Sequence, residues 1–86
     1  MNEISLSKRE SQKQQLRERI LEEAHILFSE KGADKTTVAD IVQQCDIARG
    51  TFYNYFSDIN TLFDALINQL NQRVKEAVQQ LSLIHI

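Results

Sequence analysis

Apolar residues recur every three or four positions along most of this chain, and very few residues interrupt the pattern. Proline is absent, and glycine occurs only at Gly32 and Gly50. The spacing is that of one face of an α-helix, and hairpin strands would lack the turn residues that they need. The sequence therefore predicts an all-α fold, and 86 residues are enough for one small core.

The first predicted helix runs from about residue 11 to about residue 31, and two serine capping signals, at Ser7 and Ser11, compete as its start. Its apolar face consists of Leu16, Ile20, Ala24, Leu27 and Phe28. Gly32 comes next and closes the helix, because glycine readily adopts a positive φ. Apolar residues show no sustained helical spacing over residues 1–10, so we expect a flexible arm there.

A second, short helix is predicted after Thr37. Thr37 is the expected N-terminal cap, and an acidic residue, Asp40, follows three residues later. Its apolar positions are Val38, Ile41, Val42 and Cys45. Asp46 tolerates a left-handed conformation, and Ile47 can tuck under the turn. We therefore expect a helix of eight or nine residues that ends in a tight turn.

The third predicted helix covers Arg49 to Tyr55. Phe52 and Phe56 lie four residues apart and face inward, with Phe28 and Ile41 as further core residues. The outward side chains are Arg49, Thr51, Tyr53 and Asn54. Two short helices in this arrangement let the second enter the major groove of DNA, although such pairs also serve purely as core elements.

A long fourth helix is predicted from Ser57, taken as its cap, with Asp58 at its positive end. Its apolar stripe consists of Leu62, Leu66, Leu70, Val74, Ala77 and Leu81. The stripe continues beyond what the small domain formed by the first three helices can cover. We expect an arm at 1–10, a helix-turn-helix domain at 11–57, a linking helix at 58–81 and, at 82–86, a truncation point or foreign tail.

Charge and composition restrict the function further. The net charge of −2 argues mildly against a nucleic-acid partner. Positive charge is nevertheless concentrated in the first twenty residues, where a solvated helix face is the alternative interpretation. The cations there are Lys8, Arg9, Lys13, Arg17 and Arg19.

Other classes of site have no support in the sequence. No apolar run could span a bilayer and no secretory signal is present, so we expect a cytoplasmic protein. Cys45, the single cysteine, is interpreted as a small buried hydrophobe. There is no glycine-rich phosphate loop, no Cys/His cluster and no paired nucleophile and base, so we expect neither an enzyme nor a metal or cofactor site.

Several separately spaced motifs resemble the N-terminal domain of the TetR family of transcriptional regulators. The motifs are Ile20-Leu21-Glu22-Glu23-Ala24, Leu27-Phe28-Ser29-Glu30-Lys31-Gly32, Thr36-Thr37-Val38-Ala39-Asp40-Ile41, Arg49-Gly50-Thr51-Phe52-Tyr53-Asn54-Tyr55-Phe56 and Leu62-Phe63. The resemblance implies a three-helix, homeodomain-like DNA-binding bundle in a homodimeric repressor of a palindromic double-stranded operator. A larger C-terminal domain, mostly absent from this chain, would dimerise and bind a small-molecule inducer.

The resemblance also assigns DNA contacts. Arg49 is the candidate for gripping guanine, with an exposed residue that touches only phosphate as the alternative. Tyr53 matches a position that meets phosphate, and Asn54 is suited to adenine. The assigned residues are Thr36, Thr37, Arg49, Gly50, Thr51, Tyr53, Asn54 and Tyr55. Gly50 would let its α-helix and the DNA backbone approach closely, with an ordinary glycine of the first helical turn as the alternative. Thr37 would contact phosphate, with capping of its helix alone as the alternative.

Three positions depart from the family pattern. Ala48 stands where a side-chain cap is usual, Asp46 replaces a turn glycine, and Ile59 replaces a lysine that would meet phosphate. We therefore expect modest DNA affinity that depends on the basic arm, with Lys8, Arg9 and Lys13 as its cations. The alternative function is a protein-interaction module that uses the Leu62 to Leu81 stripe.

Overall fold

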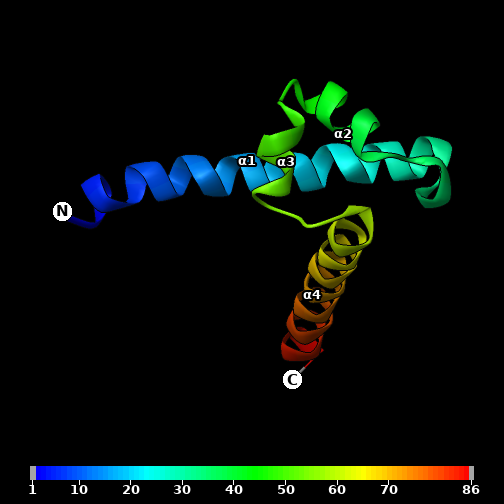
Figure 1. The fold of residues 1–86 in the computed structure, drawn as a ribbon. Helices are drawn as coiled ribbons and strands as arrows, with labels where there is room; N and C mark the ends of the chain where they lie inside the picture. The colour runs from blue at the N-terminus through cyan, green and yellow to red at the C-terminus, as the bar shows by residue number, and fades with distance from the viewer. Residues whose placement is uncertain (1, 86) are drawn as a thin grey trace.

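A computed structural model describes the backbone of residues 2–85 and the side chains of residues 8–81 (Figure 1). The described backbone is helical and contains no strand, which confirms the all-α prediction. The elements are α1 (Asn2–Lys31), a 3-10 turn η1 (Ala33–Lys35), α2 (Val38–Cys45), α3 (Arg49–Tyr53) and α4 (Ile59–His85).

The long helix α1 organises the molecule. Figure 1 shows α2 and α3 on one side of α1 and α4 leaving on the other side, while the N-terminal part of α1 extends past all three. The core lies where the helices meet, and its buried members are Ile20, Leu21, Ala24, Ile41, Cys45, Phe52, Phe56, Leu62 and Leu66. Each of the four α-helices contributes to it; α3 supplies Phe52, and the turn after α3 supplies Phe56.

The core confirms several sequence predictions. Phe52, Ile41 and Cys45 are fully buried, and Phe56 is 3% exposed. Phe28 is only half-buried, and its ring packs edge-on against the ring of Phe63, with 5.4 Å between centroids.

The predicted start of the first helix near residue 11 is wrong, because α1 begins at Asn2. Residues 2–10 contain no proline or glycine and are rich in Glu, Lys and Arg, which have good helix propensity. The capping signals at Ser7 and Ser11 therefore lie inside the helix. The flexibility of this segment stays a prediction, and the side chains of residues 1–7 lie outside the described residues.

The end of α1 follows the prediction. Gly32 adopts φ 93°, and its N–H donates to the carbonyl oxygen of Phe28 at 2.9 Å. Asp46 adopts the left-handed conformation after α2, with φ 57°. The N–H of Asp46 donates to Gln43 O, and that of Ile47 to Val42 O, which is the Schellman pattern that turns the chain toward α3.

Two helix boundaries differ from the sequence prediction. The third helix ends at Tyr53 rather than Tyr55, because the N–H groups of Asn54 and Tyr55 bond three residues back, at 3.1 and 2.9 Å, and tighten the chain into a turn. The cap of α4 is Asp58 rather than Ser57: its carboxylate accepts the N–H of Thr61 at 2.7 Å. A carboxylate also suits the positive end of the helix.

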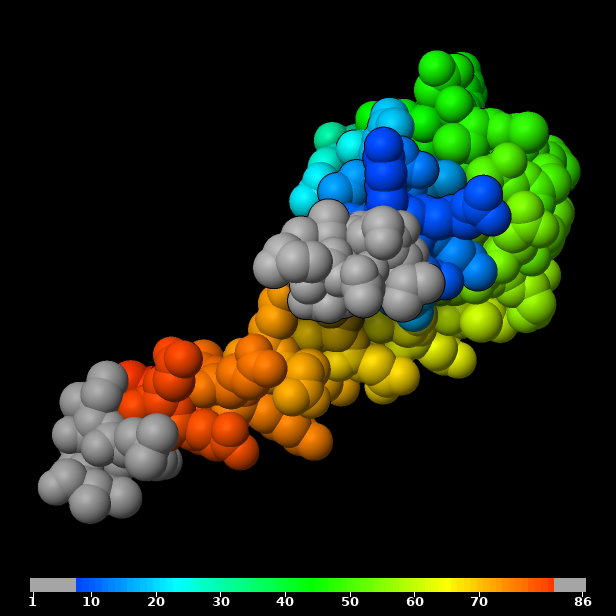
Figure 2. Space-filling model, turned by 90° about the vertical axis from the view of Figure 1, so that its left-hand side faces the viewer, coloured from blue at the N-terminus to red at the C-terminus, as the bar shows by residue number. Residues whose placement is uncertain are grey.

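The apolar stripe of α4 is covered only near the head. Leu62 and Leu66 are buried and Leu70 is half-buried, whereas Val74 and Leu81 are 61% and 58% exposed. Figure 2 shows this part of α4, in orange, projecting away from the rest of the molecule. The prediction that the stripe outruns the head is confirmed. The tail predicted at 82–86 continues α4 as far as His85, and its side chains lie outside the described residues.

Replacing Gly32 with alanine should lower the free energy of unfolding by about 1–3 kcal/mol, because a positive φ costs that much for a residue with a Cβ. The added Cβ would also lie 2.8 Å from Asp34 Oδ1. Gly50→Ala is the matched control, because its Cβ meets nothing within 4 Å. It should leave stability unchanged or raise it by up to about 1 kcal/mol. Urea unfolding followed by circular dichroism measures both, and equal losses would contradict the role of the positive φ.

Candidate nucleic-acid interface

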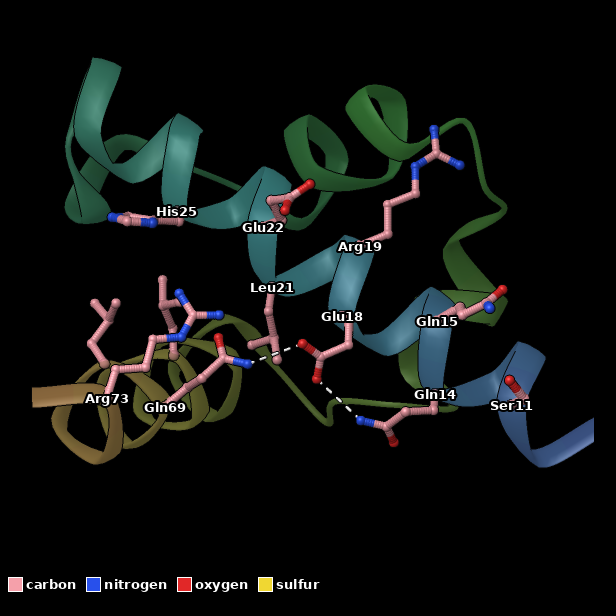
Figure 3. Close-up of a pocket in the computed structure, with 12 residues that line it drawn as sticks. Ser11, Gln14, Gln15, Glu18, Arg19, Leu21, Glu22, His25, Gln69 and Arg73 are labelled. Carbon is pink, nitrogen blue, oxygen red and sulfur yellow. Dashed lines mark hydrogen bonds between the residues drawn. The ribbon is translucent and has the colours of Figure 1, made fainter. Parts of the chain in front are cut away.

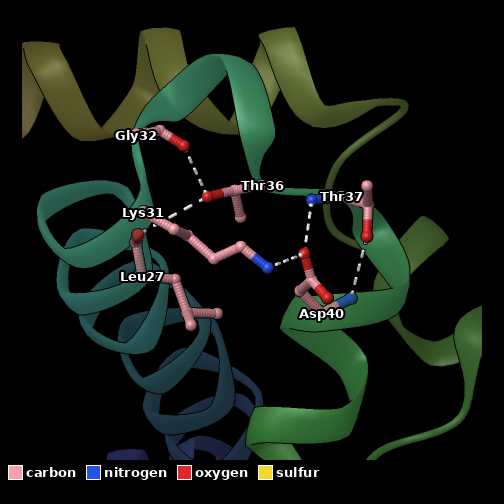
Figure 4. Close-up of polar contacts among 6 residues, drawn as sticks. All are labelled: Leu27, Lys31, Gly32, Thr36, Thr37 and Asp40. Atoms are coloured by element: carbon pink, nitrogen blue, oxygen red, sulfur yellow. Dashed lines mark hydrogen bonds and ion pairs between the residues drawn. The ribbon is translucent and has the colours of Figure 1, made fainter.

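The predicted recognition surface begins at the start of α2, where Thr37 and Asp40 form a capping box (Figure 4). The N–H of Asp40 donates to Thr37 Oγ1 at 3.1 Å, and the N–H of Thr37 donates to Asp40 Oδ2 at 3.0 Å. Lys31 Nζ lies 2.9 Å from the same Oδ2. Thr37 is exposed, so it both caps α2 and presents the first turn of α2 at the surface.

Thr36 does not belong to this exposed surface. Its side chain is only 4% exposed. Its hydroxyl donates to the carbonyl oxygen of Gly32 at 2.8 Å and lies 3.5 Å from that of Leu27 (Figure 4). The hydroxyl of Thr36 is thus held by carbonyls at the end of α1 and just after it, and a DNA contact at Thr36 stays a prediction.

The outward face of α3 carries most of the other candidates. Arg49, Gly50 and Asn54 are exposed, and Tyr53 is 46% exposed. The Tyr53 ring stands edge-on against buried Phe52, at 5.3 Å between centroids and 88° between planes. Phe52 thus anchors the helix and supports the tyrosine ring at the surface.

Thr51 and Tyr55 are half-buried, so they lie at the margin of this face, and Tyr55 packs against the core. At Gly50, by contrast, no atom of the chain lies within 4 Å of where a Cβ would be. Packing within the chain therefore gives no reason for a glycine there. Ala48 precedes α3 in an extended conformation and makes no side-chain cap bond, in agreement with the sequence analysis.

Three contacts that position this surface were not predicted from the sequence. Lys31 joins the end of α1 to Asp40 on α2, and the amide of Gln44 donates to Glu23 at 3.1 Å. The Arg17 guanidinium carbon lies 5.4 Å from the ring centroid of Phe56, a cation–π distance. No local periodicity signals such contacts, because they join residues on different segments of the fold.

A groove of about 510 Å³ separates α1 from α4 on the side away from α3 (Figure 3). Glu18 lies in it and accepts hydrogen bonds from Gln14 at 3.1 Å and from Gln69 of α4 at 3.2 Å. Leu21 and Leu66 line the groove from the core side. The Gln69–Glu18 bond is thus a polar link between the helix that leaves the head and the helix that organises it.

Other chemistry finds little support in the described part of the chain. No group of three or more His, Cys, Asp or Glu residues there could hold a metal ion. Burial raises the pKa of the Cys45 thiol, which disfavours a nucleophilic thiolate. No helix among the residues searched is long and apolar enough to cross a membrane.

Comparison with known proteins identifies relatives of this head. The profile of the family described as "Bacterial regulatory proteins, tetR family" matches residues 20–66, more than half of the chain. An uncharacterised HTH-type transcriptional regulator of Bacillus subtilis (strain 168), YvdT, is 47% identical over 53 residues, which are 62% of this chain and 27% of YvdT. No solved structure matches significantly.

Two further relatives cover similar stretches. The HTH-type transcriptional regulator TtgR of Pseudomonas putida is 34% identical over 69% of this chain and 28% of its own length. The HTH-type transcriptional repressor AcnR of Corynebacterium diphtheriae is 33% identical over 81% of this chain and 37% of its own length. The chain thus spans between 27% and 37% of the length of these relatives.

The Asp40 cap should make the stability of the head depend on acid pH. The hydrogen bond from Lys31, followed by that from the Thr37 backbone, lowers the pKa of Asp40 from its ordinary value of 3.8. A pKa lower in the folded state gives stability that is present above the unfolded value and lost as the pH falls through the folded value. D40N should therefore be less stable than the wild type at pH 7, with the difference shrinking below about pH 4. Urea unfolding at pH 7, 5, 4 and 3 measures this, and a constant difference would contradict it.

Proposed function

This chain belongs to the tetR family of bacterial regulatory proteins, and we propose on that premise that it is the DNA-binding head of a sequence-specific transcriptional repressor. The observation that carries the proposal is the outward face of α3, where Arg49, Gly50, Tyr53 and Asn54 are all exposed, as is the cap of α2. The core fixes the opposite face of α3 through Phe52. A helix held in this way presents side chains to a groove without rearranging.

In the proposed complex, α3 enters the major groove and α2 crosses the phosphate backbone. Arg49, at the start of α3, grips guanine O6 and N7 with two hydrogen bonds, and Asn54 reads an adjacent base. Thr37 and Tyr53 contact phosphate and set the register. Gly50 lets the DNA backbone approach α3 closely, which accounts for a glycine with open space around it.

The remaining parts of the proposal concern the whole regulator, which acts in the cytoplasm. Two heads of a homodimer bind the two halves of a palindromic double-stranded operator, and linking the two sites raises the affinity of each weak head. A small-molecule inducer binds outside this chain. The described contacts support a route for the signal, because Leu62, Leu66 and the Gln69–Glu18 bond join α4 to α1.

One observation favours the alternative, a protein-interaction module. The outer part of α4 exposes Val74, Val78 and Leu81, each more than half exposed. A partner helix could cover these residues. If the chain dimerises stably in sedimentation equilibrium but shifts no duplex from a random pool, this alternative replaces DNA binding.

Substitutions in α3 should separate base reading from backbone binding. Arg49→Ala should relax the preference at one base-pair position by about 1–3 kcal/mol, because one bidentate contact is lost. Tyr53→Phe should weaken all sequences alike, because it removes a phosphate contact. Selection of duplexes from a random pool, followed by anisotropy titrations of the selected and of random duplexes, measures both.

Lys75→Ala is the control, because Lys75 lies exposed on α4, away from α3. It should leave the sequence preference unchanged. If Arg49→Ala weakens selected and random duplexes by the same factor, Arg49 does not read a base.

A further inference from the structure

The N-terminal part of α1 carries a local excess of positive charge in an acidic chain. Residues 8–17 contain four cations and one carboxylate, Glu10, whereas the whole chain has a net charge of −2. Side chains 8–15 are all exposed, and Figure 1 shows this part of α1 extending past the other helices. Core packing does not explain the helix over residues 8–15, because all their side chains are exposed.

Three of the four cations follow the face of α1 that packs on the head. Arg9, Lys13 and Arg17 are spaced four residues apart, so they form one ridge along the helix. The ridge leads into Ile20 and Ala24, which are 0% exposed in the core. One side of α1 is therefore apolar where α2 and α3 cover it and cationic where they do not.

Arg17 marks the point where the ridge meets the head. Its guanidinium lies 5.4 Å from the ring centroid of Phe56, which follows the turn that ends α3. Figure 2 shows the blue side chains at the start of the described α1 beside the green surface of α2 and α3, away from the orange end of α4. The contact of Arg17 with Phe56 thus places the inner end of the ridge beside the segment that follows α3.

Two carboxylates of α1 lie on a different side of the helix from the ridge. Glu18 and Glu22 line the groove that faces α4 (Figure 3). Glu10 lies next to Arg9 in sequence and is the one carboxylate near the ridge. Glu18 and Glu22 therefore lie apart from the ridge, in a groove that Arg19 also lines, whereas Glu23 bonds to Gln44 of α2.

We propose that Arg9, Lys13 and Arg17 form a helical clamp for the phosphate backbone of double-stranded DNA, next to the base pairs that α3 reads. The proposal rests on the proposed DNA-binding function and extends its contact surface. From Arg9 to Arg17 the helix advances about 12 Å, a length of about three to four base-pair steps. The clamp binds without sequence preference, because phosphates carry no base information.

The clamp differs from the flexible basic arm predicted from the sequence. A helix fixes which cations can act together, whereas an arm would use Lys8 as readily as Lys13. Lys8 lies about 100° or more around the helix from each ridge residue. It is therefore outside the ridge and supplies a control within the same segment.

The test compares R9Q/K13Q with K8Q/K75Q, two variants that lose the same charge from exposed helical positions. Anisotropy titrations between about 50 and 200 mM salt, on a selected half-site duplex, give the slope of log affinity against log salt. R9Q/K13Q should lower the slope by about two units, and adding R17Q by about one more, since each phosphate contact contributes about 0.9. K8Q/K75Q should leave it within about half a unit of the wild type. Equal slopes for the two double variants would overturn the clamp.

Shortening the DNA supplies a second readout. Removing about four flanking base pairs, the length that the ridge spans, from both ends of the duplex should weaken wild-type binding and lower its slope, but should leave R9Q/K13Q unchanged. Equal losses in both proteins would also count against the clamp. Circular dichroism first confirms that the variants stay helical.

The two proposals can fail separately. A wild type that prefers no sequence refutes the proposed function. The salt slopes on a random duplex still test the clamp, because phosphate contacts need no particular sequence. A wild type that prefers one sequence, with slopes unaffected by the ridge, refutes the clamp alone.

Discussion

The burial of Phe52 is the interaction on which the rest of the head depends. A helix of five residues cannot persist by itself, because nucleation costs more than so few hydrogen bonds return. Phe52, fully buried, and Phe56, 3% exposed, hold the segment that contains α3 against the core. The orientation of Arg49 and Tyr53 is therefore a consequence of packing on the inner face of the same short helix.

Local backbone interactions set the ends of α1 and α2, and so direct α2 and α3 toward that core. Gly32 ends α1, the hydroxyl of Thr36 donates to the carbonyl oxygen of Gly32, and Thr37 with Asp40 starts α2. Asp46 then turns the chain in a left-handed conformation. The capping bonds satisfy backbone N–H and C=O groups at the helix ends. The same bonds that fold the chain therefore also shape the surface proposed to bind DNA.

The separation of Glu18 and Glu22 from the ridge of Arg9, Lys13 and Arg17 connects this architecture to the proposed function. An acidic chain can still bind a polyanion if its cations face the ligand and its carboxylates face elsewhere. The carboxylates Glu18 and Glu22 lie in the groove toward α4, where Glu18 accepts a bond from Gln69. The same helix thus meets DNA on one side in the proposed complex and, on the other, the helix through which a regulatory signal would arrive.

The sequence by itself determined the helices, the end of α1 and both ends of α2, since helical period, glycine, and the Thr37–Asp40 pair act over a few neighbouring residues. It also indicated the family and the exposed face of α3. Only the tertiary structure decided that Thr36 is buried and that Arg17 lies over Phe56. Burial and contacts between helices depend on residues far apart in the chain, and no local pattern records which side chains the core will cover.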